Sequence, residues 1–196
     1  ALQEAPAISP DGRQIAIVLR KNGKRHLHLL SADGGEVQLV TAAIDVQGSP
    51  AWSPDGEWLA IGGADTSGEG LFKLRKDGGA VARLTKEIGR NPAWSPDGAL
   101  IVYAGANIYT QTPLLAVRPD GTPVQLPPIR VHRDGERVRF LPGGRGLVYM
   151  QGSGAVPWQD FWLLDLATNQ SRRLTELSTP ATVRTFDISP DGTRIV

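Results

Sequence analysis

Two histidines and three aspartates are the residues whose chemistry could involve a metal ion. His26 and His28 are separated by one residue, so both would point to the same face of a strand, a spacing that can hold zinc. A zinc site needs more than two ligands, and no carboxylate partner can be assigned to the pair. Asp45, Asp134 and Asp187 precede short apolar stretches and could face a central channel. We expect these carboxylates to be solvated or to cap turns, and we predict no metal and no cofactor.

The common catalytic signatures are absent from the sequence. There is no G-x-S-x-G, no H-E-x-x-H and no G-x-x-x-x-G-K-S/T. The segment Asp65-Thr66-Ser67-Gly68 resembles an aspartic protease loop, but that chemistry needs two carboxylates that share a proton, and a second copy is missing. The chain contains no cysteine, which excludes disulfides and thiolate metal ligands. We therefore predict a chain without catalytic activity of its own.

Aromatic and basic side chains lie in segments that differ from one part of the chain to the next. Such side chains dominate the energetics of protein interfaces. For Trp158 the alternative is local packing beneath its own loop, next to Pro157. The residues that we predict to contact a protein or peptide are Tyr109, Trp158, Arg90, His132, Arg133, Arg137 and Arg184.

A five-residue phrase recurs along the chain and determines the elements that must carry these side chains. The starts of successive copies are separated by 44, 42, 46 and 48 residues. A period of about 40 to 50 residues is typical of propeller blades. The copies are ISPDG at 8–12, WSPDG at 52–56, WSPDG at 94–98, FLPGG at 140–144 and ISPDG at 188–192.

The phrase has the composition of a tight turn between two antiparallel strands. Ser9 can cap the turn, Pro10 presets its φ angle, and Gly12 tolerates a positive φ at the end. Apolar stretches bounded by further turns such as Asp-Gly-Gly complete each unit, and no helix is expected. The predicted strands are 5–9, 15–20, 27–32 and 36–41; 50–53, 58–62, 71–76 and 81–85; 92–95, 100–104, 114–118 and 123–126; and 139–142, 147–151, 161–166 and 171–175.

The repeated phrase, an I-A-like strand after it and an L-T ending together resemble the WD40-like propeller repeats of the TolB family. The endings are Leu39-Val40-Thr41, Arg83-Leu84-Thr85 and Arg173-Leu174-Thr175. The resemblance implies an all-β propeller of four-stranded antiparallel blades and a periplasmic or otherwise extracytoplasmic location. We predict blades at 1–44, 45–88, 89–130 and 131–178 and an incomplete one at 179–196, which would form part of a ring of six or seven blades.

Tryptophans at equivalent places in the repeat are predicted to pack between blades. Trp52 and Trp94 hold the position that Ile8 holds in the first unit. Trp58 and Trp162 lie within predicted strands and are expected to pack in the same way.

Strand direction alternates within a unit, so the short turns share one face of the disc and the other connections share the opposite face. Binding residues concentrate in loops that a rigid scaffold presents. This variable-loop face is predicted to comprise 44–49, 64–70, 86–91, 105–112, 127–137 and 152–160.

Charge and hydropathy narrow the class of partner. The net charge of +1 gives no reason to expect a nucleic acid, which is usually bound by a clustered basic face. No apolar run approaches the roughly 20 residues that a membrane helix requires. The expected partner is a protein or peptide, with a second copy of the chain as a further possibility.

Three functions remain open from the sequence. The leading one is a non-catalytic interaction module, resembling the TolB propeller, that binds a protein or peptide on the variable-loop face. The second is the gating propeller of a prolyl-oligopeptidase-like serine peptidase. The third is the extracytoplasmic sensor domain of a bacterial Ser/Thr kinase. The domains encoded beside this one in the full-length gene would distinguish them.

Overall fold

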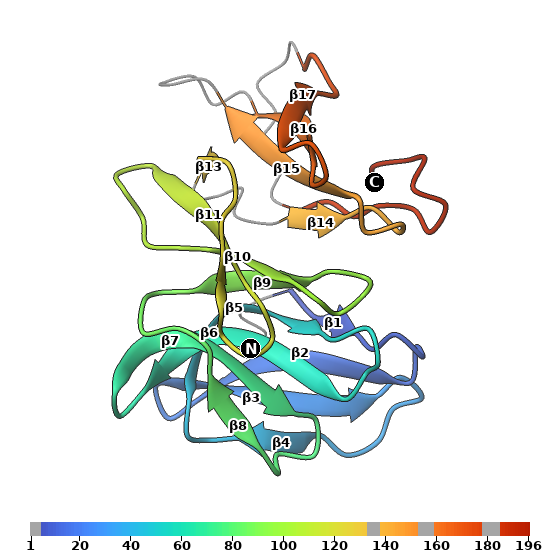
Figure 1. Ribbon diagram of the computed structural model, residues 1–196. Helices are drawn as coiled ribbons and strands as arrows, with labels where there is room; N and C mark the ends of the chain where they lie inside the picture. Colours follow the sequence, from blue (N-terminus) through green and yellow to red (C-terminus); the bar gives the residue numbers. More distant parts are fainter. Residues whose placement is uncertain (1–4, 133–137, 153–158, 178–184) are drawn as a thin grey trace.

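The computed structural model describes residues 5–132, 138–152, 159–177 and 185–196. All regular structure in these residues is β-strand, and the strands form four antiparallel sheets that follow one another along the chain (Figure 1). The prediction of an all-β propeller built from four-stranded blades is confirmed.

Each sheet is a meander in which consecutive strands are neighbours. The first sheet contains β1 (Ala7–Ile8), β2 (Gln14–Lys21), β3 (Lys24–Ser31) and β4 (Gln38–Thr41), and the second contains β5 (Asp45–Trp52), β6 (Trp58–Asp65), β7 (Gly68–Arg75) and β8 (Val81–Arg83). The third contains β9 (Arg90–Trp94), β10 (Ile101–Ala104), β11 (Gln111–Val117) and β12 (Pro123–Val124), with β13 (Arg130–His132) also paired to β11. The fourth contains β14 (Val138–Phe140), β15 (Gly146–Gly152), β16 (Gln159–Asp165) and β17 (Gln170–Arg173).

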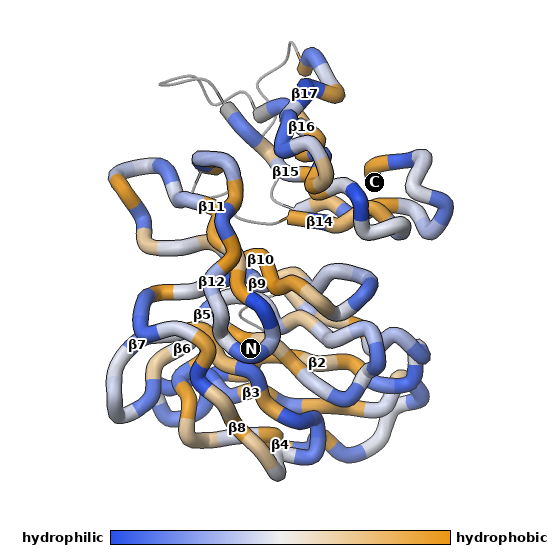
Figure 2. The backbone as a smooth tube through the Cα atoms, in the orientation of Figure 1, coloured by the Kyte–Doolittle hydropathy of each residue, from blue (hydrophilic) through white to orange (hydrophobic). Residues whose placement is uncertain are grey.

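Alternation along the strands places apolar side chains on both faces of each inner sheet, which is what packing face to face requires. In β6, Leu59 and Ile61 pack toward the first sheet, whereas Ala60 between them packs toward the third. In β10, Val102 packs toward the fourth sheet, and its neighbour Tyr103 packs toward the second. Figure 2 shows the apolar stretches along the strands and the hydrophilic ones at the turns.

The repeated phrase forms the same turn wherever it occurs. In the first copy the Gly12 amide donates to the Ser9 carbonyl over 2.9 Å, and Gly12 has a φ of 73°. The Ser9 hydroxyl donates to Asp11 Oδ1 over 2.6 Å and accepts the Gln14 amide at 2.9 Å, so one side chain organises both sides of the turn. In the four copies that contain both residues, the predicted turn chemistry therefore operates through the serine and the aspartate together, whereas the fourth copy keeps only backbone bonds, such as the one from the Gly144 amide to the Leu141 carbonyl.

Consecutive turns also touch one another. A Cβ atom on Gly56 would lie 3.6 Å from Cδ of Pro10, which is ordinary van der Waals contact. The same relation holds between Gly98 and Pro54, and between Gly144 and Pro96, at 3.8 and 3.7 Å. The proline of each turn thus lies beside the glycine of the next.

The R-L-T endings attach the end of a blade's outer strand to the adjacent strand of the same sheet. In the second sheet the Thr85 hydroxyl accepts the Leu71 amide at 3.0 Å, and the Leu84 amide donates to the Leu71 carbonyl over 2.7 Å. Arg83 reaches across to form an ion pair with Asp65 and to donate to the Glu69 carbonyl over 2.7 Å. The fourth sheet repeats the leucine and threonine hydrogen bonds with Leu174 and Thr175, while Arg173 forms its ion pair with Asp160 of the adjacent strand β16.

Two predicted loops of the variable-loop face were wrong because strands occupy them. Residues 44–49 fall mostly within β5, and 64–70 form the closed end of the β6–β7 hairpin, with Asp65 paired to Gly68. The strand predicted at 58–62 continues to Asp65, and Gly62 within it serves close packing: a Cβ on Gly62 would lie 1.8 Å from the Gly89 carbonyl oxygen. Glycine at this position of β6 allows the backbone of the connection that contains Gly89 to approach the strand closely.

The outer edge of the third sheet also departs from prediction. The sequence predicted one strand at 123–126 followed by a loop, whereas the structure has two short strands, β12 and β13, on the same edge of β11. Leu115 of β11 faces the four-residue segment 125–128 between them. Pro127 and Pro128 have no amide hydrogen to donate to a ladder, so the segment bows away from the sheet as an arch.

The tryptophans lie between blades to different extents. Trp52 is buried, and its indole N–H donates to the Ala7 carbonyl of the first sheet over 3.0 Å. The indole N–H of Trp94 is buried without a hydrogen-bond partner among the described residues. Trp58 is half-buried and lies beneath the ammonium group of Lys73, 4.6 Å from its ring centroid.

Candidate functional site

The connection between β10 and β11 presents the most exposed aromatic side chain in the described part of the chain. Ile108 and Gln111 exchange backbone hydrogen bonds of 2.7 and 3.1 Å, which closes a two-residue turn around Tyr109 and Thr110. Tyr109 is 93% exposed and has a φ of 60°, a left-handed conformation that costs a non-glycine residue about 1 kcal/mol. The turn therefore holds a large aromatic side chain in water at an energetic cost.

Strand register brings two further predicted site residues to this end of the third sheet. Arg90 begins β9 and pairs with Ala104, the last residue of β10 before the connection. His132 ends β13 and pairs with Gln111 at the base of the Tyr109 turn. Arg90 is half-buried, and its Nε is buried without a hydrogen-bond partner among the described residues.

Tyr109, Arg90 and His132 are thus brought to one region from three different strands or connections. Arg133, Arg137, Trp158 and Arg184 lie outside the described residues, as does the side chain of His132. The binding role of all seven residues stays a prediction.

A separate cavity of about 350 Å³ lies along the innermost strands of the sheets. Its lining repeats with the blades, because β1, β5, β9 and β14 each contribute, together with the segment that follows residue 185. Arg139 Nε and Asp187 Oδ1 form an ion pair of 3.1 Å at its wall. The lining residues include Pro6, Ala7, Pro50, Ala51, Pro92, Ala93, Arg139 and Asp187.

Side chains of one blade hold the inner strand of the blade before it. The Ser49 hydroxyl accepts the Ala5 amide at 3.2 Å, and the Asn91 side-chain carbonyl accepts the Ser49 amide at 2.9 Å. Sequence analysis did not single out these residues. The signal was available, since Ala5, Ser49 and Asn91 each precede a Pro-Ala pair at the repeat interval.

The candidate carboxylates differ in their roles. Asp187 lines the inner cavity, where it could contact a bound group. Asp45 instead accepts the Arg25 amide at 2.8 Å and so caps a strand. Asp134 lies outside the described residues.

The histidine pair lies on β3, as expected, with both side chains half-buried. His28 Nδ1 lies 3.1 Å from the His26 carbonyl oxygen. Among the described residues, no group of three or more His, Cys, Asp or Glu side chains is placed to hold a metal ion. The two histidines contribute to the face of the first sheet that points away from the second sheet.

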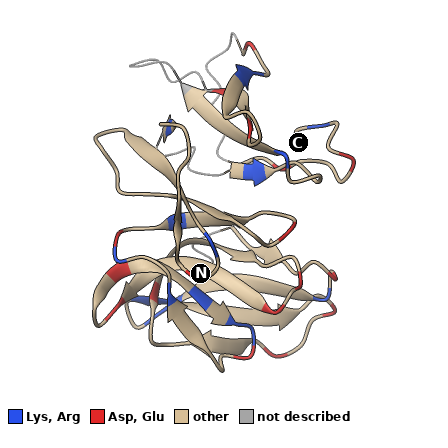
Figure 3. Ribbon diagram, in the orientation of Figure 1, with Lys and Arg blue, Asp and Glu red and all other residues tan. Residues whose placement is uncertain are grey.

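Figure 3 marks the Lys and Arg positions and the Asp and Glu positions along the ribbon, and both kinds are dispersed over the strands and turns. Ion pairs such as Lys76 with Glu57, at 2.8 Å, neutralise some of them locally.

Four-stranded meanders packed face to face, with their first strands around a common cavity, define a β-propeller. The chain belongs to the family of the TolB beta propeller domain, whose family model matches residues 1–122. No curated protein sequence matches it.

Solved structures with a similar fold include TolB proteins. A protein described as a TolB from Agrobacterium tumefaciens is 25% identical, with a TM-score of 0.70, and the match covers 85% of this chain and 62% of that one. TolB from Acinetobacter baumannii is 20% identical, with a TM-score of 0.72 and coverage of 87% and 42%. The chain therefore spans about 42 to 62% of these TolB structures.

Enzymes with propellers share the fold as well. An oligogalacturonate lyase in complex with manganese is 14% identical, with a TM-score of 0.72, and the match covers 97% of this chain and 56% of the lyase. At this level of identity the likeness concerns the fold alone.

The part of the chain that the structure describes contains no helix that is long and apolar enough to cross a membrane.

Proposed function

We propose that this chain is a non-catalytic interaction domain that binds a protein or peptide on the face formed by the β10–β11 turn, the start of β9 and the end of β13. The observation that carries the proposal is Tyr109, which is fully displayed on a turn in a left-handed conformation. A solvent-exposed aromatic ring held at an energetic cost is the kind of side chain that dominates interface energetics.

The surroundings of Tyr109 support the same reading. Ile108 beside it is 43% exposed, which adds apolar surface to the tip. Thr112 donates to the Asn107 side chain over 2.8 Å and so fixes the base of the connection. A fixed tip reduces the ordering cost of association, because less side-chain and loop freedom is lost on binding.

The TolB family membership favours a periplasmic location for this binding. A protein partner is consistent with structural relatives, since one of them comes from the structure of a nidogen–laminin complex. The identity of the partner follows from neither comparison.

A photo-crosslinking amino acid placed at position 109 tests the proposal. In periplasmic extract we expect a defined crosslinked protein from position 109 and none from position 33, which lies in the β3–β4 turn on the opposite face. The captured protein should then bind the purified chain in calorimetry, and Tyr109→Ala should weaken that binding by about tenfold or more, as for a typical hot spot.

Two results would contradict the proposal. One is an affinity for the captured protein that Tyr109→Ala leaves unchanged. The other is a hydrolase domain in the full-length gene, positioned so that this propeller covers its active site.

A further inference from the structure

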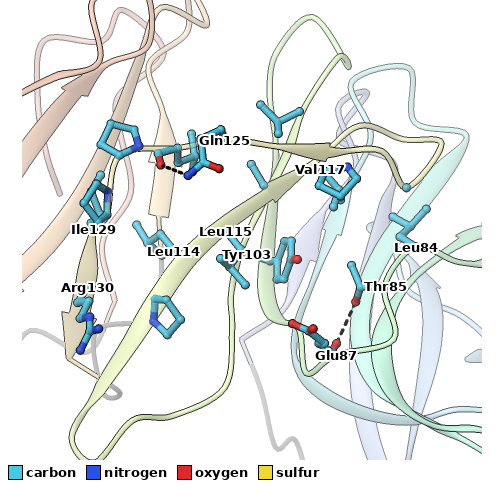
Figure 4. A pocket seen from close by; sticks show the side chains of 18 of the residues that line it. Leu84, Thr85, Glu87, Tyr103, Leu114, Leu115, Val117, Gln125, Ile129 and Arg130 are labelled. Atoms are coloured by element: carbon cyan, nitrogen blue, oxygen red, sulfur yellow. Dashed lines mark hydrogen bonds between the residues drawn. The ribbon is translucent and has the colours of Figure 1, made fainter.

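A cavity of about 720 Å³ opens between the second and third sheets. Figure 4 shows β11 crossing the cavity, with Tyr103 at its centre and Leu84, Thr85 and Glu87 on the side of the second sheet. The volume lies within the range of about 300 to 1,000 Å³ that is typical of small-molecule sites.

The cavity exists because of the arch between β12 and β13. Four residues of the arch face Leu115 of β11, so the outer edge of the sheet is lifted where a regular strand would fill the space. The Leu114 amide donates to the Ile129 carbonyl over 3.0 Å, and the Ile129 amide donates to the Pro127 carbonyl over 2.7 Å. These bonds fix the end of the arch and keep it open.

Buried apolar side chains form part of the wall, and the Tyr103 hydroxyl opens into the space between them. Leu84, Leu114, Val117 and Ile129 are buried around the space. Tyr103 is only 5% exposed, and its hydroxyl has no hydrogen bond to any described residue. This hydroxyl reaches the open space of the cavity, so a ligand there can form a hydrogen bond with it in place of water.

Charges of opposite sign lie on two sides of this hydroxyl. Glu87 is on the side of the second sheet, and Arg130 of β13 is on the other side of Tyr103 and Leu114 (Figure 4). Burial raises the pKa of Tyr103, and the negative charge of Glu87 raises it further, so the phenol stays protonated. Lys86 and Arg130 are exposed at the mouth.

We propose that this cavity binds a short apolar peptide of two or three residues, with its free amino group at Glu87 and Tyr103 and its carboxylate toward Arg130. The ammonium group donates to the Glu87 carboxylate and to the Tyr103 hydroxyl oxygen. Apolar side chains of the peptide replace water against the leucine and valine walls. The site is distinct from the Tyr109 surface and does not depend on that surface binding a partner.

The test uses the full chain and three forms of one probe: Leu-Ala-Leu with free ends, with an acetylated amino end, and with an amidated carboxyl end. Binding is followed by amide chemical shifts of Leu115 and Val117 in NMR. We expect the free peptide to bind about fivefold more tightly than either blocked form, the factor that one partly exposed charge pair contributes.

Variants assign each end of the peptide. Glu87→Gln should abolish the preference for the free amino end but keep the preference for the free carboxylate, and Arg130→Gln should do the reverse. Glu36→Gln and Arg172→Gln, both on exposed residues outside the cavity, should change neither preference. Tyr103→Phe should weaken binding about threefold and leave the denaturant midpoint unchanged, because the hydroxyl makes no hydrogen bond in the free protein.

Three outcomes would overturn the proposal. The first is an absence of shifts at Leu115 and Val117 up to the solubility limit of the peptide. The second is equal affinity for the free and acetylated forms, which would mean that the cavity recognises apolar bulk alone. The third is easier unfolding of Tyr103→Phe with unchanged binding, which would give the hydroxyl a structural role.

Discussion

Ser53 and Asp55 illustrate how single side chains stabilise the repeated turn. The Ser53 hydroxyl donates to Asp55 Oδ1 over 2.5 Å, and the Glu57 amide donates to the same oxygen over 3.0 Å. These hydrogen bonds lower the pKa of Asp55, with the serine hydroxyl as the larger cause. Asp11, Asp97 and Asp191 are held below their ordinary pKa in the same way, and Asp191 reaches about 2.

Because of these carboxylates, we predict that the folded chain becomes less stable in acid. Each pKa is lower in the folded chain than in the unfolded chain, so the stabilisation is fully present above about pH 4 and is lost as the pH falls toward 2. We expect the free energy of unfolding to decrease over this range in urea titrations followed by circular dichroism. Asp97→Asn and Asp191→Asn should each reduce the slope of the free energy of unfolding against pH.

Asp33→Asn is the matched control, because the Asp33 carboxylate accepts no hydrogen bond from the described residues and the turn is of another kind. Its slope should equal that of the unmodified chain. A slope that Asp97→Asn and Asp191→Asn also leave unchanged would contradict the role assigned to the serine and aspartate pair.

Arg173 offers a comparison of a buried and an exposed carboxylate on the same cation. Asp160 Oδ2 lies 2.6 Å from Arg173 and its side chain is 12% exposed, whereas Glu176 lies 3.7 Å away and is 88% exposed. Burial alone would raise the pKa of Asp160, but the Leu177 amide and the Arg173 guanidinium outweigh burial and lower it. The buried carboxylate is therefore ionised and hydrogen-bonded.

We expect Asp160→Ala to reduce the free energy of unfolding by about 2 kcal/mol, because it removes a charge-assisted network. Glu176→Ala should cost less than about 0.5 kcal/mol, as for an exposed ion pair. Urea denaturation of both variants is the measurement. Equal losses would show that burial does not set the strength of the pair.

At the scale of elements, the close approach of β6 to the connection before β9 depends on Gly62. A Cβ at this position would lie 1.8 Å from the Gly89 carbonyl oxygen and 2.9 Å from that of Gln47, so backbone would have to move. We expect Gly62→Ala to lower the free energy of unfolding by about 3 kcal/mol.

Gly143→Ala is the corresponding control, since nothing lies within 4 Å of the Cβ it would add. Its unfolding midpoint should stay close to that of the unmodified chain. A Gly62→Ala chain as stable as the control would show that β6 can shift at little cost.

Sequence analysis succeeded where one short phrase determines local geometry. It failed where the role of a glycine or a proline depends on tertiary packing or on strand pairing. The turns at Ser9 and Ser53 could be predicted because the residues that form them are adjacent in sequence. The continuation of β6 past Gly62 to Asp65 was missed, because the reason for a glycine there is Gly89, which lies in another connection. The arch at Pro127 was placed in a loop, but its return to β11 as β13 depends on tertiary pairing.

The candidate site could be predicted from the sequence only in part, for the same reason. Tyr109 could be chosen from its residue type and its place between strands. Its proximity to Arg90 and His132 depends on the register of three strands, which the sequence does not state. The cavity below the arch could not be predicted, because no motif accompanies it.

At the scale of the whole molecule, one face of the first sheet is not packed against another sheet among the described residues, whereas both faces of the second and third sheets are. Ile8 is 66% exposed, although Trp52 at the equivalent position of the second sheet is only 8% exposed and contacts the sheet before it. Leu39, on the same side of the first sheet, is 48% exposed. Apolar surface of this kind favours association.

We therefore expect the isolated 196-residue chain to self-associate with increasing concentration in sedimentation velocity. Ile8→Asp should shift the distribution toward monomer, because it places a charge in the contact. Val81→Asp, at an exposed apolar residue of the separate outer strand β8, should not. A chain that remains monomeric at all concentrations would contradict this expectation.

The contact between the proline of one turn and the glycine of the next has a consequence for how such proteins change over evolutionary time. Because the joint is the same between neighbouring units, a tandem duplication of one unit supplies both halves of a new joint at once. Gene duplication can therefore alter the number of units without the invention of any new interface.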